Sequence, residues 1–188
     1  MYLTMFPLIL GGIANMVFTK TKFYKKHASP MDKGKVWKDG KRVFGENKTW
    51  IGFVSMIIFC IFFQIICGSL CNILQWNYAN DLYVSNDNTI WFNALFGALI
   101  GFTYMLFELP NSFIKRRLDI DAGKSGRGIK GIIFFIIDQI DSLVGVMFIL
   151  YLFTDISIWK YFGYILVGAF THIAVNGFLC LMKVRKRL

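Results

Sequence analysis

Charged residues are scarce in this chain of 188 residues. They make up 17% of the sequence, whereas soluble domains usually contain about a quarter. Hydrophobic residues reach 56% and aromatic residues 18%. Because the apolar residues form runs that are long enough to cross a bilayer, the sequence excludes a soluble domain with a single packed core.

The patterns of zinc and disulfide proteins are also missing. The four cysteines form no CxxC pair, and Cys60, Cys67 and Cys180 lie inside apolar runs, where small buried side chains are expected. The two histidines, His27 and His172, lie far apart in different kinds of segment. We therefore expect no zinc site. The first apolar run has no basic segment before it, so we interpret it as a retained helix and not as a cleaved signal peptide.

Acidic residues are fewer than basic ones. The chain has 21 Lys and Arg against 11 Asp and Glu, which gives a formal net charge of +10. In a membrane protein this excess indicates topology and anionic partners such as lipid headgroups or nucleotides. It does not indicate nucleic-acid binding, because the sequence contains no soluble basic module.

The apolar runs predict an all-α integral membrane protein that forms one domain over residues 1–188. A transmembrane helix needs about 20 mainly apolar residues, and lipid tolerates only backbone whose hydrogen bonds are made internally. Five segments meet this requirement. The expected transmembrane helices are residues 2–19, 49–70, 89–107, 131–153 and 161–182.

The basic residues are sorted between alternate connections. All the Lys and Arg residues except one lie in segments 20–48, 108–130 and 183–188. The two connections between them, 71–88 and 154–160, contain only Lys160. By the positive-inside rule, the basic segments lie in the cytoplasm. We expect the N-terminus outside, the C-terminus inside and two long cytoplasmic loops.

Two acids in the fourth expected span, Asp138 and Asp141, are the first candidate for function. An ionised carboxylate in hydrocarbon is costly, so intramembrane acids are functional candidates. Their i, i+3 spacing places both on one helix face, about 10 and 15 Å from the cytoplasmic end of the span. Oxygen donors without nearby His or Cys favour Mg²⁺ or Mn²⁺. A proton-coupling pair in a transporter, or a structural ion pair, remains an alternative.

Two basic segments accompany the acid pair on the cytoplasmic side. NSFIKRR, at residues 111–117, follows Glu108 at the end of the third span, and DGKRVFGENKTW occupies residues 39–50. Arg, Lys and glycine backbone N–H groups are typical phosphate ligands. From the residues alone, we interpret the three features as one site for metal-dependent phosphate chemistry, or transport, on a membrane lipid.

These three motifs, in this order and spacing, resemble those of the CDP-archaeol synthase family. Members of that family are membrane CTP-dependent cytidylyltransferases related to the CDP-diacylglycerol synthases. DQIDSLVG, at residues 138–145, corresponds to the closing acidic motif of the family. The resemblance covers the whole chain, including the five-span plan.

The resemblance implies roles for particular residues. Asp138 and Asp141 would coordinate Mg²⁺, with Glu108 as a further candidate ligand, and Mn²⁺ is an alternative metal. Catalytic roles are implied for Asp138, Asp141, Lys115 and Arg116. The residues implied near the phosphates of nucleotide or lipid are Asp39, Gly40, Arg42, Gly45, Lys48, Thr49, Ser112 and Arg117. Pro30 and Asp32 match a further family feature at the start of the first loop.

The chain also departs from the family pattern. Phe107-Glu108-Leu109 stands where Gly-Asp-Leu is usual, Ile51 stands where Arg is common, and a proline expected shortly before the acid pair is missing. These changes indicate a divergent branch, whose lipid need not be archaeal.

The implied reaction is attack by a lipid phosphate oxygen on the α-phosphorus of CTP, with release of pyrophosphate. The implied partners are CTP, a membrane lipid phosphate and the lipid bilayer of the cell membrane, with the site facing the cytoplasm. Small-residue spacings such as Gly97 and Gly101 suggest close helix packing and are compatible with a homodimer. A small secondary transporter, or a lipid-binding membrane protein that uses the acid pair, is the alternative. A transporter predicts charges along a path through several spans, and these are nearly absent.

Overall fold

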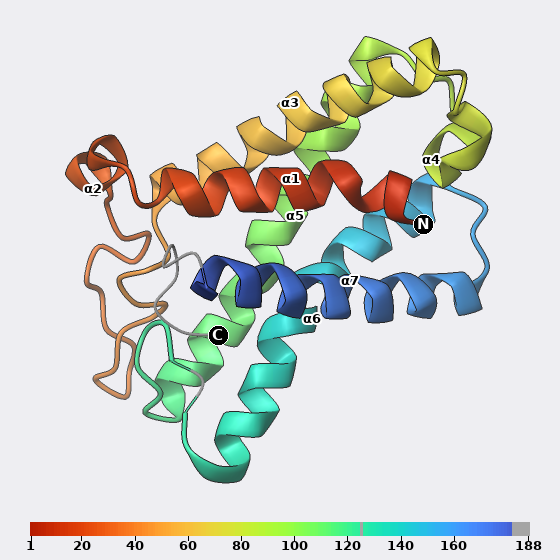
Figure 1. Cartoon of the computed structure of the whole chain (residues 1–188). Helices are drawn as coiled ribbons and strands as arrows, with labels where there is room; N and C mark the ends of the chain where they lie inside the picture. The colour runs from red at the N-terminus through yellow and green to blue at the C-terminus, as the bar shows by residue number, and fades with distance from the viewer. Residues whose placement is uncertain (125, 182–188) are drawn as a thin grey trace.

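The computed structural model describes residues 1–124 and 126–181, and this part of the chain is helical without a β-strand (Figure 1). Two isolated β-bridges are the extent of its β-pairing. The all-α prediction is confirmed. The basic tail at residues 183–188 lies outside the described residues, as does residue 182, the last of the fifth expected span. The helices are α1 (Tyr2–Phe18), α2 (Lys22–His27), α3 (Trp50–Ile73), η1 (Asn77–Ala79), α4 (Asp81–Val84), α5 (Ile90–Arg117), α6 (Gly128–Phe153) and α7 (Ile158–Leu181).

Four helices are long and apolar enough to cross a membrane, namely α3, α5, α6 and α7. The fifth expected span corresponds to α7, whereas the first corresponds to α1, an apolar helix of 17 residues. At 1.5 Å per residue, α1 is about 25 Å long, less than the ~30 Å of a typical hydrocarbon core. The described residues therefore contain four candidate spans and one shorter apolar helix.

The second of the two expected loops is shorter than predicted. We predicted a loop-like connection over residues 108–130, but α5 continues to Arg117 and α6 already begins at Gly128. Pro110 is accommodated inside α5, and the three basic residues that follow lie in its last turn, where they interact favourably with the helix dipole. The NSFIKRR motif is consequently helical and projects from a rigid element.

Glycines allow α3 and α5 to pack closely. A Cβ on Gly97 would lie 2.7 Å from Cα of Ile61, and one on Gly101 would lie 2.8 Å from Cα of Ile57. Such distances leave no room for a side chain, so both glycines are required where the two helix backbones meet. The close packing predicted from the spacing of these glycines therefore occurs between two helices of the same chain.

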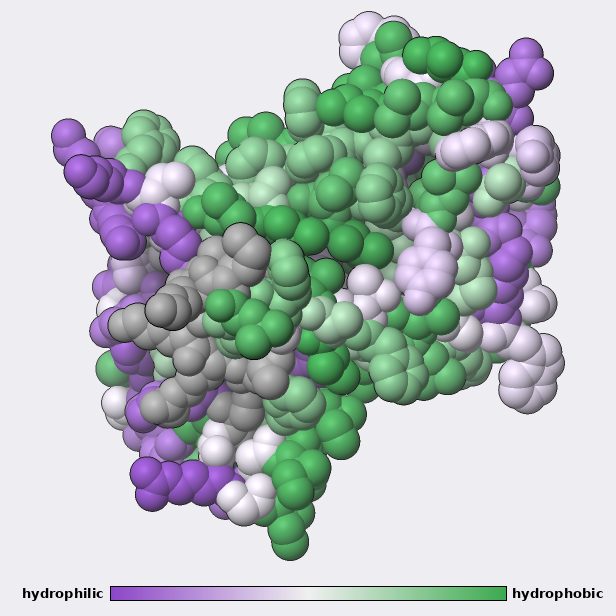
Figure 2. Space-filling view, in the orientation of Figure 1, coloured by the Kyte–Doolittle hydropathy of each residue, from purple (hydrophilic) through white to green (hydrophobic). Residues whose placement is uncertain are grey.

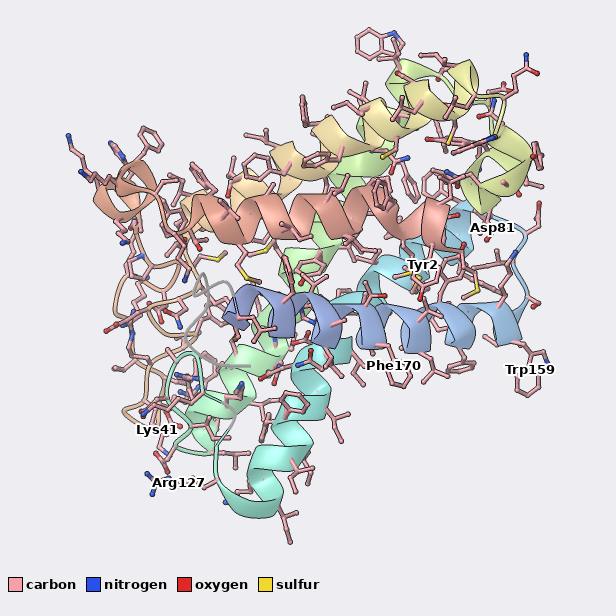
Figure 3. All side chains as sticks on the ribbon, viewed as in Figure 1. Tyr2, Lys41, Asp81, Arg127, Trp159 and Phe170 are labelled. Carbon is pink, nitrogen blue, oxygen red and sulfur yellow. The ribbon has the colours of Figure 1, made fainter. Side chains whose placement is uncertain are left out.

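The surface separates into an apolar belt and two hydrophilic ends. Figure 2 shows hydrophobic residues over the middle of the visible face and hydrophilic residues gathered at both sides. Lys41 and Arg127 lie at the end that carries α2 and the connection between α2 and α3, whereas Asp81 and Trp159 lie at the opposite end (Figure 3). This arrangement is that of a multi-helix protein embedded in a membrane.

Candidate functional site

The two acids of α6 face α5 and are joined by one amide. Nδ2 of Asn111 donates hydrogen bonds to Oδ1 of Asp138 and to Oδ2 of Asp141, each at 2.7 Å. Nζ of Lys115 donates to both carboxylate oxygens of Asp138, at 2.7 and 2.9 Å. Oδ1 of Asp141 also accepts a 2.6 Å hydrogen bond from the backbone N–H of Ser142. The predicted acid pair therefore lies against the helical NSFIKRR motif.

A third acid joins the pair from α5. Glu108, Asn111 and Lys115 recur at helical spacing, which places them along one face of α5. The carboxylate of Glu108 forms an ion pair with Lys48, which lies just before α3. Residues 28–49, which join α2 to α3 and are called the first connection, therefore meet α5 through side chains that are 60 positions apart in the sequence.

These side chains line one cavity, which contains about 1000 Å³ of space, part of it open to solvent. Its wall is formed mainly by α5, α6, α7 and the first connection, with smaller contributions from α1 and from the connection between α5 and α6. The predicted site residues in this wall are Lys48, Glu108, Ser112, Lys115, Arg116, Asp138 and Asp141. A single cavity thus contains three carboxylates, two lysines and an arginine, which is a suitable environment for phosphate groups and a divalent cation.

An apolar groove adjoins this cavity. It is formed mainly by α1, α6 and α7 and contains about 540 Å³ of space. Met16, Tyr104, His172 and Asn176 line both the groove and the polar cavity. In the structure they mark the boundary between the polar and apolar spaces.

The first connection is organised around the buried carboxylate of Asp32. Its oxygens accept hydrogen bonds from the backbone N–H groups of Gly34, Phe44 and Gly45, at 2.9 to 3.1 Å, and from Arg42 at 2.6 Å. Burial opposes ionisation of Asp32, but Arg42 and the three N–H groups outweigh it, so the pKa of Asp32 lies well below its ordinary range. The ionised carboxylate determines the path of the connection.

Four of the predicted phosphate-binding residues hold this connection in place. Nε of Arg117 lies 2.6 Å from Oδ2 of Asp39, and Nη2 of Arg117 donates to the backbone oxygen of Arg42. Gly40 forms a turn with a φ of 74°, a conformation that favours glycine. Asp39, Gly40, Arg42 and Arg117 thus lie outside the cavity wall, and they fasten the first connection to the end of α5.

The remaining two predicted residues have separate positions. Thr49 caps α3 by accepting a hydrogen bond from the N–H of Gly52, and its hydroxyl is 2.6 Å from that of Tyr24. Gly45 lies beside Arg116, in a hollow next to the main cavity. Asn111 is the residue that sequence reasoning gave no role. Its place within NSFIKRR, between Glu108 and Lys115 on one helix face, was the signal that could have identified it.

The donor set fits a hard divalent cation. Mg²⁺ is usually held by one or two carboxylates together with substrate phosphates and water. Asp138 and Asp141 share one hydrogen-bond donor and therefore converge, and Glu108 lines the same cavity. No cluster of three or more His, Cys, Asp or Glu side chains suited to a metal occurs among the described residues. A cation here would thus rely on substrate oxygens for part of its coordination.

Comparison with known proteins gives a consistent result. The family model for CarS-like CDP-archaeol synthases matches residues 5–186. The CDP-archaeol synthase of Thermococcus kodakarensis is 31% identical over 151 residues, which cover 79% of this chain and 75% of that protein. The CDP-archaeol synthase of Thermococcus gammatolerans is 31% identical over 170 residues, covering 84% and 81% respectively.

A solved structure shares the fold. It is that of an intramembrane enzyme for archaeal membrane lipid biosynthesis, and it covers 93% of this chain and 91% of its own. The TM-score is 0.63 and the sequence identity 20%. The two proteins therefore share their helical fold over almost the whole length of this chain.

Proposed function

The chain belongs to the CDP-archaeol synthase family, and from this premise we propose that it transfers the cytidylyl group of CTP to a membrane lipid phosphate. The products are a CDP-lipid and pyrophosphate, and the reaction contributes to phospholipid synthesis. The family membership that the three sequence motifs predicted is confirmed. The transporter and lipid-binding alternatives are not favoured.

The observation that carries this proposal is the shared wall between the polar cavity and the apolar groove. A lipid phosphate has a doubly charged headgroup and long apolar chains, so it needs two such spaces side by side. We place the phosphate in the cavity with CTP and the first part of the chains in the groove. Tyr104, His172 and Asn176 then lie close to the junction of headgroup and chain.

The chemistry requires positioning and charge neutralisation. An oxygen of the lipid phosphate attacks the α-phosphorus of CTP, the bond from that phosphorus to the bridging oxygen breaks, and pyrophosphate leaves with the electron pair. A phosphate monoester is already anionic at neutral pH, so no protein base or nucleophile is needed. The work of the protein is to align the two phosphates and to stabilise their charge.

The basic residues of the cavity supply that charge. Lys115 and Lys48 are held by Asp138 and Glu108 in this structure, and both lysines can exchange these carboxylates for phosphate oxygens when substrates bind. Arg116 and Ser112 lie in the same wall. We propose that these four side chains contact phosphates. Asp39, Gly40, Arg42 and Arg117 would act by holding the first connection, and Thr49 and Gly45 by shaping its end.

We propose that Asp138 and Asp141 hold Mg²⁺, with Glu108 beside them and Mn²⁺ as a substitute. The bound ion supplies Lewis-acid neutralisation of the triphosphate. The support is the donor set, since three carboxylates line the cavity, and Lys48, Lys115 and Arg116 are available for the phosphates.

The membrane topology also belongs to this proposal. We place α1 as a fifth membrane crossing, with the N-terminus outside and the cavity open to the cytoplasm. The cavity lies at the end that carries the first connection and the end of α5, where most of the Lys and Arg residues are found. By the positive-inside rule, this end faces the cytoplasm.

Pyrophosphate release by the purified protein tests the proposal. The assay contains CTP, Mg²⁺ and one lipid phosphate at a time, including phosphatidic acid and an unsaturated archaeol-type ether phosphate. Release with CTP and one lipid, absent with ATP, is expected and identifies the lipid class. Folded protein that releases no pyrophosphate with any lipid phosphate would overturn the proposal.

A further inference from the structure

The amide of Asn111 connects the two acids of α6. The residue is buried, with 7% of its surface exposed, and its Nδ2 contacts both acids of α6. Its own Oδ1 is buried and has no hydrogen-bond partner among the described residues. A buried acceptor without a partner is unfavourable. The side chain therefore tolerates an unpaired oxygen while its two N–H bonds point at the two carboxylates.

The orientation of this amide follows from its neighbours. If the amide were rotated by half a turn, Oδ1 would face two carboxylates, and three acceptors would meet without a donor between them. The orientation in the structure is therefore imposed by Asp138 and Asp141.

The contacts also control the distance between the acids. One carboxylate oxygen from each acid lies 2.7 Å from the same nitrogen, so the two oxygens lie within twice that distance of each other. Two carboxylates of like charge repel, and without a shared donor each would turn toward its own partner. Lys115 does not provide this link, because within the described part of the chain its Nζ donates hydrogen bonds to Asp138 alone.

We propose that Asn111 is a positioning residue of the reaction, which holds Asp138 and Asp141 convergent on one divalent cation. This inference rests on the proposed function, because it assumes that the two acids bind the cation. Asn111 acts through the acids and orients them before the cation arrives. Residues that orient metal ligands commonly change metal affinity by about 10–100-fold when they are replaced.

Mn²⁺ binding in the absence of nucleotide tests the role directly. Electron paramagnetic resonance titration of the full chain in detergent gives the dissociation constant for wild type, Asn111→Leu and Asn111→Ser. Leucine is similar in size to asparagine and donates nothing, so its dissociation constant should rise by about 10–100-fold. Serine keeps one hydroxyl donor and should give a smaller rise. The serine variant carries the test if the leucine variant does not fold.

Gln64→Leu is the matched control. Gln64 is a buried amide in α3 that is 1% exposed, leaves its own oxygen unpaired and contacts Tyr83 and Asn93 instead of the acids. This variant should bind Mn²⁺ as wild type does. Equal loss in Gln64→Leu and Asn111→Leu would overturn the inference, because the effect would then come from the loss of any buried amide.

Failure of the inference can be separated from failure of the proposed function. Wild-type Mn²⁺ affinity in both Asn111 variants, together with loss of binding in Asp141→Asn, would overturn the role of Asn111 and leave the acids as ligands. A wild-type protein that transfers cytidylyl groups but binds no Mn²⁺ without nucleotide would also overturn it, while the proposed function stands. Absence of both binding and transfer would overturn both.

Discussion

At the end of the bundle near α4, Gln64, Tyr83 and Asn93 form a buried network of neutral side chains. Nε2 of Gln64 lies 3.0 Å from the Tyr83 hydroxyl, which donates a 2.6 Å hydrogen bond to Oδ1 of Asn93. Asn93 then donates to Asn88 at 2.7 Å. At the other end, the charged side chains Lys48, Glu108, Lys115, Asp138 and Asp141 surround an open cavity. We call these the amide end and the charged end.

The comparison shows which buried polar groups indicate a site. Neutral amides and hydroxyls are both donors and acceptors, so they can satisfy one another and close the space between helices. Carboxylates and ammonium groups are more costly to bury and persist only when they are paired or have a function. At the charged end Glu108 and Asp138 are paired with lysines and Asp141 accepts hydrogen bonds, and the cavity still leaves room for a ligand. Charge together with space, and not polarity alone, distinguishes this end.

The largest expected effect follows from removing a charge at the charged end. Asp141→Asn keeps the size of the side chain but removes a ligand of the proposed cation, so pyrophosphate release should fall by at least about 100-fold. Thermal unfolding should show no loss of stability, because one repelling carboxylate has been neutralised. Turnover within a few-fold of wild type would show that the acid pair is structural, like the amide end.

The next effect concerns a lysine. Lys115 is 7% exposed and contacts Asp138, so Lys115→Met should lower kcat/KM for CTP by about 10–100-fold. Lys124→Met is the matched control, because Lys124 is exposed and pairs with Asp121 in the connection before α6. Steady-state kinetics of the two variants compare a lysine of the cavity with one of the surface. Equal kinetics would contradict the assignment.

A smaller effect is expected from the carboxylate that organises the first connection. The pKa of Asp32 is lower in the folded protein than in the unfolded chain, where it is about 3.9. Its ionised form therefore stabilises the fold above that pH, and the stabilisation is lost as the pH falls through the lower folded value.

Asp32→Asn tests this effect. Hydrogen exchange of residues 28–48 in the wild type should rise as the pH is lowered below about 4, after correction for the intrinsic exchange rate. The variant should exchange faster than the wild type at neutral pH and show little of this pH dependence. We expect its KM for CTP to rise several-fold with kcat nearly unchanged. If the corrected hydrogen exchange of residues 28–48 in the wild type did not change with pH, this account of the connection would be contradicted.

The smallest effect on catalysis is expected at the amide end. Gln64→Leu removes two hydrogen bonds within the neutral network, so the free energy of unfolding should fall by about 1 kcal/mol. Turnover at a temperature where the protein remains folded should not change. Thermal unfolding and pyrophosphate release, measured on one preparation, separate the two quantities. A large loss of turnover would mean that the amide end takes part in the reaction.

The sequence was sufficient to predict the helical fold, the family and the acid pair. Apolar runs of about 20 residues can only be helices in lipid, and intramembrane acids are rare enough to be noticed. The length of α5 was not predictable from composition. The residues from Glu108 to Arg117 have the charge and polarity of a connection, yet they continue the helix through Pro110.

The division of the site residues was also beyond the sequence. Lys48 and Arg42 belong to one motif of basic and glycine residues, but Lys48 lines the cavity whereas Arg42 faces Asp32. In an irregular connection, spacing does not determine direction, unlike the period of a helix or strand. The bridge made by Asn111 depends on how α5 and α6 cross, which no local pattern contains.

The central claim is that the charged end transfers the cytidylyl group of CTP to a lipid phosphate. Its most direct test uses CTP labelled either at the α- or at the γ-phosphorus, with the lipid phosphate that supports pyrophosphate release. The α-label should enter the lipid fraction and the γ-label should leave as pyrophosphate, in wild type and Gln64→Leu but not in Asp141→Asn. Transfer of the γ-label to the lipid, or transfer of the α-label by Asp141→Asn at the wild-type rate, would contradict the account.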